Sequence, residues 1–285
     1  MRWRAAGLLL VLLALLALAS AWHRHPLQVA EAGTVPVAGG DGGGLPRAAA
    51  EAEGFDAHSL GEAAGLARAQ GSSALLVLRH GHLVYEQYAG GADAATLVDG
   101  GELADVLVML AARIAAMNNA LVMPPGPGLD RGRLAAAIAA ASHLGYPQFL
   151  SRNVWQQLNA APARWSPTTM RARAGDWLRV AEVLLHDGRF EGTQLIPGGW
   201  SQQLVRPTPA PGSEAYAASD MACLRGPGAT RLWLAPSLDL AVLRVAPAPA
   251  TGAIDEARLV NMIVRAVRDR PATGGVSLND LVFGH

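Results

Sequence analysis

The periodicity of its apolar residues limits the possible folds of this chain more than any other feature. Residues Ser73–Arg79 form an apolar run and Leu83–Tyr88 alternate, and the His80–Gly81 pair between them suits the turn of a β-hairpin. Helical spacing follows over residues 102–117, 130–142, 147–155 and 174–186. Pro197 is expected to begin a short fifth helix with Trp200 and Leu204 on its inner side.

Strand patterns return in the last third of the chain, at residues 220–224, 230–234 and 240–245. A last amphipathic helix is expected over 255–268, and a first one over 59–70, where Ser59 and Glu62 have the spacing of a capping box. The order of hairpin, helical block, strand meander and closing helix predicts an α/β (α+β) fold. We expect one antiparallel sheet of about five strands, flanked by the first and last helices.

The first 54 residues are expected to lie outside this folded unit. Two arginines precede an apolar run that ends near Trp22, which is typical of a signal peptide or an N-terminal membrane anchor over residues 1–22. The Gly-rich segment 23–54 lacks apolar periodicity and is expected to be a flexible linker. The domain is expected over 55–270, followed by a C-terminal tail, 271–285. This arrangement predicts a periplasmic or extracytoplasmic protein that is secreted, or that contacts the membrane through its N-terminal segment.

The composition argues against several kinds of chemistry. All 23 basic residues are arginine, so no lysine amine is present that burial could turn into a general base. The 23 acidic residues balance them, and this neutrality argues against a nucleic-acid partner. The single Cys223 excludes an intramolecular disulfide and is expected to be a small buried core residue. His80 and His82 flank the hairpin turn but have no third metal ligand nearby in the sequence, so neither a metal nor a cofactor is expected.

Five segments carry further patterns in a fixed order. They are the hairpin Leu75–Tyr88, the Y-x-x-F-L segment Tyr146–Leu158, the D-x-x-R helix Ala174–Arg189, the Q-x-x-P-x-x-W turn Gln194–Trp200 and the strand pair Leu232–Leu243. Together they resemble the β-lactamase-related serine hydrolases, which include class C β-lactamases, penicillin-binding-protein-like peptidases and esterases, and 6-aminohexanoate-dimer hydrolases. The resemblance covers most of residues 58–270. It implies a β-lactamase/transpeptidase-like fold, here with a reduced helical lobe.

The resemblance also implies an S-x-x-K motif at the start of the helix after the hairpin, in which serine attacks a carbonyl and lysine helps to activate it. Glu102 falls at the serine position and Asp105 at the lysine position. A carboxylate pair at this spacing shares one side of a helix and in principle supports acid–base chemistry. The helix dipole alone also favours acidic residues in a first turn, without any catalytic role.

The other two motifs of that family are replaced as well. At the Y-x-N or S-x-N position, Pro124–Asp130 contains no tyrosine, serine or asparagine, and only a short connection joins it to the preceding helix. At the K-T-G or H-x-G position a glycine turn is kept, but the Lys or His is absent. Arg225, Thr230 and Arg231 are therefore the candidate binding residues there.

Three hypotheses follow from these departures. In the first, the chain is an exported, catalytically inactive relative of the serine hydrolases that binds a cell-envelope component or a small-molecule ligand, or is a decaying gene product. In the second, it is an active envelope esterase or amidase with displaced residues, such as Ser166 beside Glu102 or His82. In the third, the sequence around 118–128 carries a deletion relative to an ordinary hydrolase, which resequencing of the locus would decide. The sequence gives no prediction of the oligomeric state.

Overall fold

The computed structural model describes residues 33–118, 121, 130–199, 201, 206–211, 214–247 and 256–269. Apart from Gly33 and Thr34, these residues belong to one compact unit that begins at Val35. The expected leader over 1–22 and the tail over 271–285 lie outside the described residues. In the described ranges, no helix combines the length and apolar character that crossing a membrane requires.

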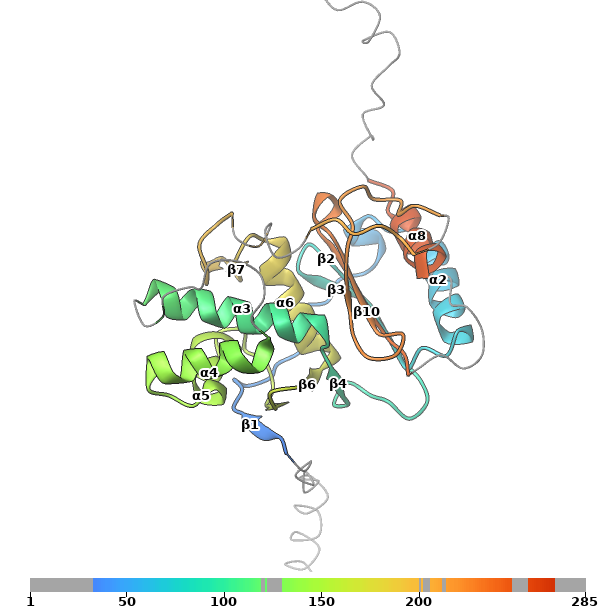
Figure 1. Cartoon of the computed structure of the whole chain (residues 1–285). Helices are drawn as coiled ribbons and strands as arrows, with labels where there is room; N and C mark the ends of the chain where they lie inside the picture. Colours follow the sequence, from blue (N-terminus) through green and yellow to red (C-terminus); the bar gives the residue numbers. More distant parts are fainter. Residues whose placement is uncertain are drawn as a thin grey trace, which may run out of the picture. The chain divides into compact units, whose positions relative to one another are not determined.

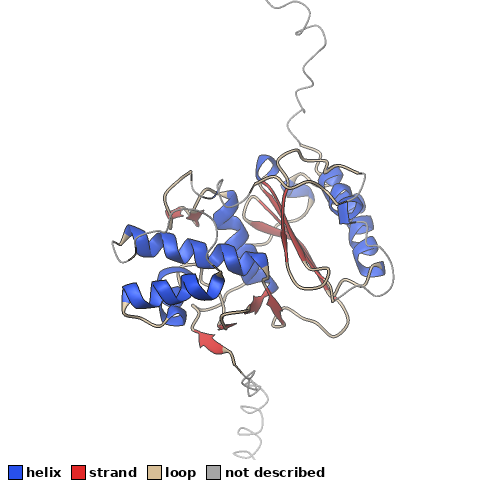
Figure 2. Cartoon of the chain, in the orientation of Figure 1, coloured by secondary structure: helices blue, strands red, loops and turns tan. Residues whose placement is uncertain are grey.

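The central sheet has five antiparallel strands in the order β3-β2-β11-β10-β9 (Figures 1 and 2). Its strands are β2 (Ala74–Arg79), β3 (His82–Tyr88), β9 (Ala222–Arg225), β10 (Arg231–Ala235) and β11 (Leu240–Val245). Strand β2 pairs along its whole length with β11, so the early hairpin joins the late meander in one sheet. The prediction of a five-stranded antiparallel sheet is confirmed.

Helices α2 (Ala57–Ala69) and α8 (Glu256–Ala266) cover one face of this sheet (Figure 1). Leu60 of α2 and Val260 of α8 are buried there in one apolar cluster with Trp233 of the sheet. Helix α2 begins two residues earlier than predicted, because the carboxylate of Asp56 accepts a hydrogen bond from the Ser59 amide at 2.7 Å. The predicted cap at Ser59 is therefore wrong: Ser59 supplies the capped amide.

The other face carries the helical part of the molecule (Figures 1 and 2). Its helices are α3 (Glu102–Met117), α4 (Arg131–Ser142), α5 (Tyr146–Leu150), the π-helical turn η2 (Ser151–Trp155) and α6 (Ala174–Leu185). Helix α6 packs directly on β2, β10 and β11. Its Trp177 meets Trp155 edge to face, with ring centroids 6.0 Å apart. All four long helical predictions are confirmed, whereas most of the fifth, including Trp200 and Leu204, lies outside the described residues.

A second, four-stranded sheet was not predicted. Its strands run in the order β1-β5-β6-β4. They are β1 (Val35–Val37), β4 (Leu97–Asp99), β5 (Ala163–Trp165) and β6 (Met170–Arg173). The hairpin β7 (Arg189–Phe190) and β8 (Thr193–Gln194) and the short turns η1 (Glu51–Glu53) and η3 (Pro236–Leu238) complete the described elements. Strands of two to four residues are too short to show an alternating pattern.

Residues 35–54 belong to the fold, so the prediction that folded structure begins near residue 55 is wrong. Val37 is fully buried, and the amide of Gly40 donates to the Ala160 carbonyl at 2.8 Å. A Cβ added to Gly39 would lie 2.2 Å from the Ala160 oxygen, so glycine permits this close approach of two backbones. The glycine at this position therefore serves close backbone packing and not the flexibility of a linker.

Candidate active-site region and its pocket

The start of helix α3 presses against the end of edge strand β9. Gly101 precedes the helix with φ +53°, and a Cβ there would lie only 2.4 Å from the carbonyl oxygen of Arg225. A Cβ on Gly100 would meet the ring of Trp177 at 2.5 Å. Two successive glycines therefore let the chain fit between a tryptophan ring and a strand end, and they set the position of the first helical turn.

The carboxylate of Glu102 is hydrogen-bonded to a backbone amide of strand β9. Its Oε2 accepts a hydrogen bond from the amide of Arg225 at 2.8 Å. Two residues earlier on the same strand, the amide of Cys223 donates to Thr208 Oγ1 at 3.0 Å. Side chains of the same chain thus bind both of these edge amides.

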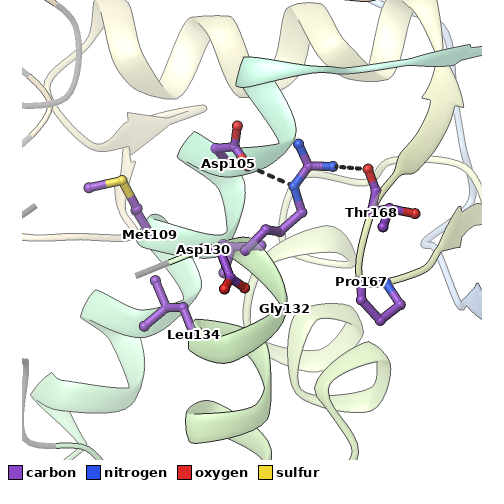
Figure 3. Close-up of a pocket in the computed structure, with 9 residues that line it drawn as sticks. Asp105, Met109, Asp130, Gly132, Leu134, Pro167 and Thr168 are labelled. Carbon is purple, nitrogen blue, oxygen red and sulfur yellow. Dashed lines mark hydrogen bonds and ion pairs between the residues drawn. The ribbon is translucent and has the colours of Figure 1, made fainter. Parts of the chain in front are cut away.

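Asp105 points instead to an arginine that the sequence analysis did not identify. Arg131, the first residue of α4, donates from Nε to Asp105 Oδ1 at 2.7 Å (Figure 3). Its other nitrogens donate to the carbonyl oxygens of Gly101, at 2.8 Å, and Thr168, at 3.0 Å. Arg131 therefore joins the starts of α3 and α4 to the turn at 166–169. Glu102 and Asp105 share the first turn of α3, as predicted, but bind different partners.

A cavity of about 590 Å³ opens between α3, α4 and this turn (Figure 3). Asp105, Asp130 and Arg131 give it charged walls. Val108, Met109, Leu134 and Pro167 provide its apolar walls. Its volume lies within the range of pockets that hold small molecules. We call it the α3–α4 pocket.

The hydroxyl of Ser166 stabilises the turn in which it lies. Ser166 Oγ accepts hydrogen bonds from the amides of Thr169, at 3.1 Å, and Thr168, at 3.3 Å, and lies 3.2 Å from Thr168 Oγ1. In the described part of the chain it contacts neither Glu102 nor His82. The structure does not assemble the nucleophile–base pair that the second hypothesis requires.

Comparisons with known proteins support the fold assignment. No protein-family model matches the sequence, and no curated protein matches it significantly. Among solved structures, a Bacillus anthracis protein provisionally named as a 6-aminohexanoate-dimer hydrolase has a TM-score of 0.64 at 15% identity, covering 82% of this chain and 90% of its own. A β-lactamase from Mycobacterium bovis has a TM-score of 0.53 at 16% identity, covering 69% and 95%. This chain has the β-lactamase/transpeptidase-like fold. The expected reduction of its helical lobe stays a prediction, because residues 119–120 and 122–129 lie outside the described ranges.

The three candidate binding residues near β9 and β10, namely Arg225, Thr230 and Arg231, each contact different partners. Arg231 forms a bidentate ion pair with Glu256, at 2.9 and 2.7 Å, and Thr230 Oγ1 bonds to the backbone of Ala246. Neither residue lines the α3–α4 pocket. Arg225 reaches the start of α3 through its backbone only, in the contact with Glu102.

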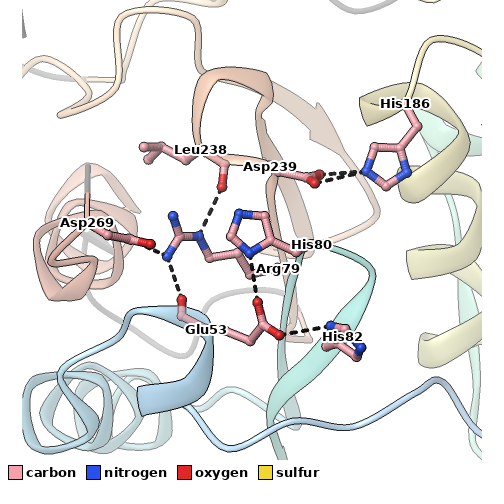
Figure 4. Close-up of polar contacts among 8 residues, drawn as sticks. All are labelled: Glu53, Arg79, His80, His82, His186, Leu238, Asp239 and Asp269. Atoms are coloured by element: carbon pink, nitrogen blue, oxygen red, sulfur yellow. Dashed lines mark hydrogen bonds and ion pairs between the residues drawn. The ribbon is translucent and has the colours of Figure 1, made fainter. Parts of the chain in front are cut away.

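His82 lies at the hairpin turn in a different polar cluster (Figure 4). The carboxylate of Glu53 lies between two histidines, 2.7 Å from His80 Nδ1 and 2.9 Å from His82 Nδ1. Glu53 lies in the segment 23–54, which the Gly-rich sequence predicts to be a linker, so no local pattern marks it as part of a polar cluster. Among the residues with a described placement, no group of three or more His, Cys, Asp or Glu is arranged to hold a metal ion.

Glu182, His186 and Asp239 form a second titratable cluster on the far side of the same turn. His186 Nε2 lies 2.8 Å from Asp239 Oδ1, and this hydrogen bond raises the pKa of His186 (Figure 4). Burial raises the pKa of Glu182 to about 7. Perturbed acids and bases of this kind occur in catalytic sites and also in structural networks. None of the three residues lines the α3–α4 pocket, so we assign them a structural role.

Proposed function

We propose that this chain is an exported protein related to the β-lactamase-like serine hydrolases, that it binds a ligand in the α3–α4 pocket, and that it does not hydrolyse β-lactams, esters or amides. The ligand is a cell-envelope component or a small molecule. Export and membrane contact are inferred from the N-terminal apolar segment.

The contact between Glu102 Oε2 and the Arg225 amide carries the proposal. Acyl transfer needs a nucleophile with a base within hydrogen-bond reach, and donors for the oxyanion that develops. At the position where the family resemblance implies serine, this chain has a carboxylate that already accepts from the neighbouring strand. Its negative charge would also repel an oxyanion formed beside it.

The position that the resemblance assigns to lysine supports the same conclusion. Asp105 is bound by the guanidinium of Arg131 at 2.7 Å. A carboxylate oxygen that already accepts a hydrogen bond from an arginine is not free to take a proton from an attacking group. Loss of a nucleophile and base that act as a unit typically lowers turnover by about 10⁶-fold.

Activity assays and covalent labelling test the absence of hydrolysis. The purified protein is expected to give no serine adduct with a fluorophosphonate or β-lactam probe, and no nitrocefin or p-nitrophenyl ester turnover above background. The double variant Glu102→Ser with Asp105→Lys is expected to stay inactive, because the residues at the other two motif positions are also replaced. Turnover by the wild type that disappears in Ser166→Ala would overturn the proposal in favour of a displaced nucleophile.

Binding in the pocket is tested with a substitution that fills it. Met109 lines the α3–α4 pocket and is partly exposed, so Met109→Trp is expected to fill the cavity with little cost to the fold. Met117 is exposed on the same helix but does not line the cavity, so Met117→Trp is the matched control. In a fragment screen by ligand-observed NMR, bound fragments are expected to lose affinity at least about tenfold in Met109→Trp only. Equal binding to both variants would refute the pocket assignment.

A further inference from the structure

The small sheet β1-β5-β6-β4 has an outer face that does not pack on the hydrophobic core. Successive residues of a strand point to opposite sides of a sheet, so the strand register assigns each residue to a face. The inner face is buried in the core through Val37, Ala163, Met170 and Ala172. The outer face has partly or fully exposed residues, and one row of them crosses all four strands: Pro36, Arg164, Arg171 and Asp99. We call it the arginine face.

Two like charges lie side by side in this row. Arg164 of β5 is directly opposite Arg171 of β6. The Cβ atoms of such neighbours are roughly 5 Å apart, a spacing at which like charges repel each other. Arg171 donates to the Leu97 carbonyl at 3.1 Å and Arg164 also interacts within the chain, and both guanidinium groups remain charged. An anionic partner would relieve the repulsion between them.

Acidic groups around the row reduce this positive charge but do not cancel it. Asp99 is the acid of the row, and its carboxylate accepts two hydrogen bonds within the chain. Arg173 lies on the same face two residues farther along β6 and interacts electrostatically with Asp93 in the turn before β4. Buried Asp176 also lies near it, but is paired with Arg179 at 3.6 Å. Three arginines and two carboxylates at the surface thus leave one positive charge in excess.

The chain that precedes β1 limits how far this face can lie from a membrane. Strand β1 begins at Val35, so only residues 23–34 separate it from the apolar segment that ends near Trp22. A chain of that length spans at most about 50 Å. Val35 is 45% exposed and Pro36 is exposed, so apolar side chains border the arginines. Because a short tether gives a high effective concentration, even a small charge excess is enough to hold the face on an anionic surface.

We propose that the arginine face docks the folded unit on anionic lipid headgroups, whose phosphate oxygens accept from Arg164 and Arg171, with Val35 and Pro36 at the level of the headgroups. Guanidinium groups suit this role, because their planar donors match the oxygens of a phosphate. Each arginine near an anionic surface strengthens the contact roughly fivefold. The docking rests on the membrane contact proposed above, but not on the α3–α4 pocket or on the absence of hydrolysis.

Energy transfer from the full-length chain to an acceptor lipid tests this orientation. A dye is attached at Ala95→Cys, in the exposed turn beside edge strand β4, while the buried Cys223 stays unlabelled. Vesicles contain phosphatidylcholine alone, or phosphatidylcholine with phosphatidylglycerol. Phosphatidylglycerol is expected to raise the ratio of docked to undocked molecules about five- to tenfold. Salt at about 1 M, where the screening length is only about 3 Å, should abolish this rise. A dye at Ala69→Cys, on helix α2 at the far side of the large sheet, should show no rise (Figure 1).

Double variants show whether the two arginines hold the orientation. Arg164→Gln with Arg171→Gln is expected to abolish the rise with phosphatidylglycerol. Arg164→Lys with Arg171→Lys keeps the charge and should retain most of the rise, which separates loss of charge from damage to the sheet. Arg68→Gln with Arg206→Gln removes the same charge from exposed positions elsewhere and should leave the rise unchanged. A rise that persists in the glutamine variant of the arginine face would overturn the proposal.

Flotation of the same samples separates this docking from the membrane contact of the N-terminal segment. Chains that float with phosphatidylcholine but show no rise with phosphatidylglycerol would refute the docking and leave the anchor. Chains that float only with phosphatidylglycerol, and no longer float in the glutamine variant, would support the docking and refute the anchor. Chains that float with neither lipid would overturn both. Binding of soluble polyphosphate without any rise on vesicles would identify a site for soluble polyanions and would also overturn the docking.

Discussion

Buried charge at Glu182 gives this protein a predictable response to pH. In the unfolded chain Glu182 loses its proton near pH 4.5, whereas burial raises its pKa to about 7 in the folded state. Between these values the folded state binds more protons, so stability is full at the lower pH and is lost as the pH rises toward 7. His186 acts in the same direction above its ordinary 6.5, because its hydrogen bond to Asp239 raises its pKa.

Glu182→Gln is therefore expected to flatten the pH dependence of stability between about pH 4.5 and 7. At pH 7.5 the variant should be more stable than the wild type by on the order of 1–2 kcal/mol, a value reduced for partial solvent screening. Urea unfolding at a series of pH values measures this difference. Glu62→Gln, on an exposed face of α2, is the control and should leave the profile unchanged. A variant that is no more stable than the wild type at pH 7.5 would contradict the buried-acid account.

Sequence reasoning placed single residues well where the information was local. It put Glu102 and Asp105 in one helical turn, as found. Their partners could not be predicted, because Arg131 and Arg225 lie 26 and 123 positions away along the chain. Ser166, considered for catalysis, instead fixes its own turn, which was the simpler reading of a serine before proline.

Among the elements, long periodic segments were predictable and short strands were not. The predicted bounds of α3, 102–117, agree with the structure, because sixteen residues repeat the helical pattern more than four times. Strands β1, β4 and β5 have three residues each, and β1 and β4 pair with strands that lie far away in the sequence. The position of α3 against β9 depends on a feature that periodicity does not record, namely the close approach at Gly101.

Gly101→Ala is expected to destabilise the protein by about 2–4 kcal/mol. The new Cβ would lie 2.4 Å from the Arg225 oxygen, and the residue would have to keep a positive φ. Gly61→Ala is the matched control, because it lies inside α2 and its Cβ would meet no atom within 4 Å. That substitution is expected to stabilise the protein by about 0.5–1 kcal/mol, since alanine favours the helix. Chemical denaturation of both variants tests the pair, and a neutral Gly101→Ala would show that α3 can move away from β9.

At the scale of the folded unit, the segment 35–47 connects the two sheets. Its β1 pairs with β5 of the small sheet, and a few residues later the Leu83 amide of β3 donates to the Pro46 carbonyl at 2.7 Å. Between these contacts, Gly43 accepts a hydrogen bond from Arg179 of α6. Because the glycines of this segment lack side chains, the sequence has no apolar pattern there from which these contacts could be predicted.

Removal of this segment is expected to destabilise the whole unit. A chain that begins at Val35 should keep the stability of the described fold, whereas one that begins at Phe55 loses the buried side chains of Val37 and Leu45. Each such side chain contributes about 1.5–3 kcal/mol, so the longer deletion should cost roughly 3–6 kcal/mol and leave Arg179 buried with one partner fewer. Denaturant unfolding of the two chains measures the difference.

Hydrogen exchange on the full chain provides a second test, because the Gly40 amide should be protected by its bond to Ala160. Equal stability of the two chains, together with rapid exchange at Gly40, would show instead that residues 35–54 are a flexible linker.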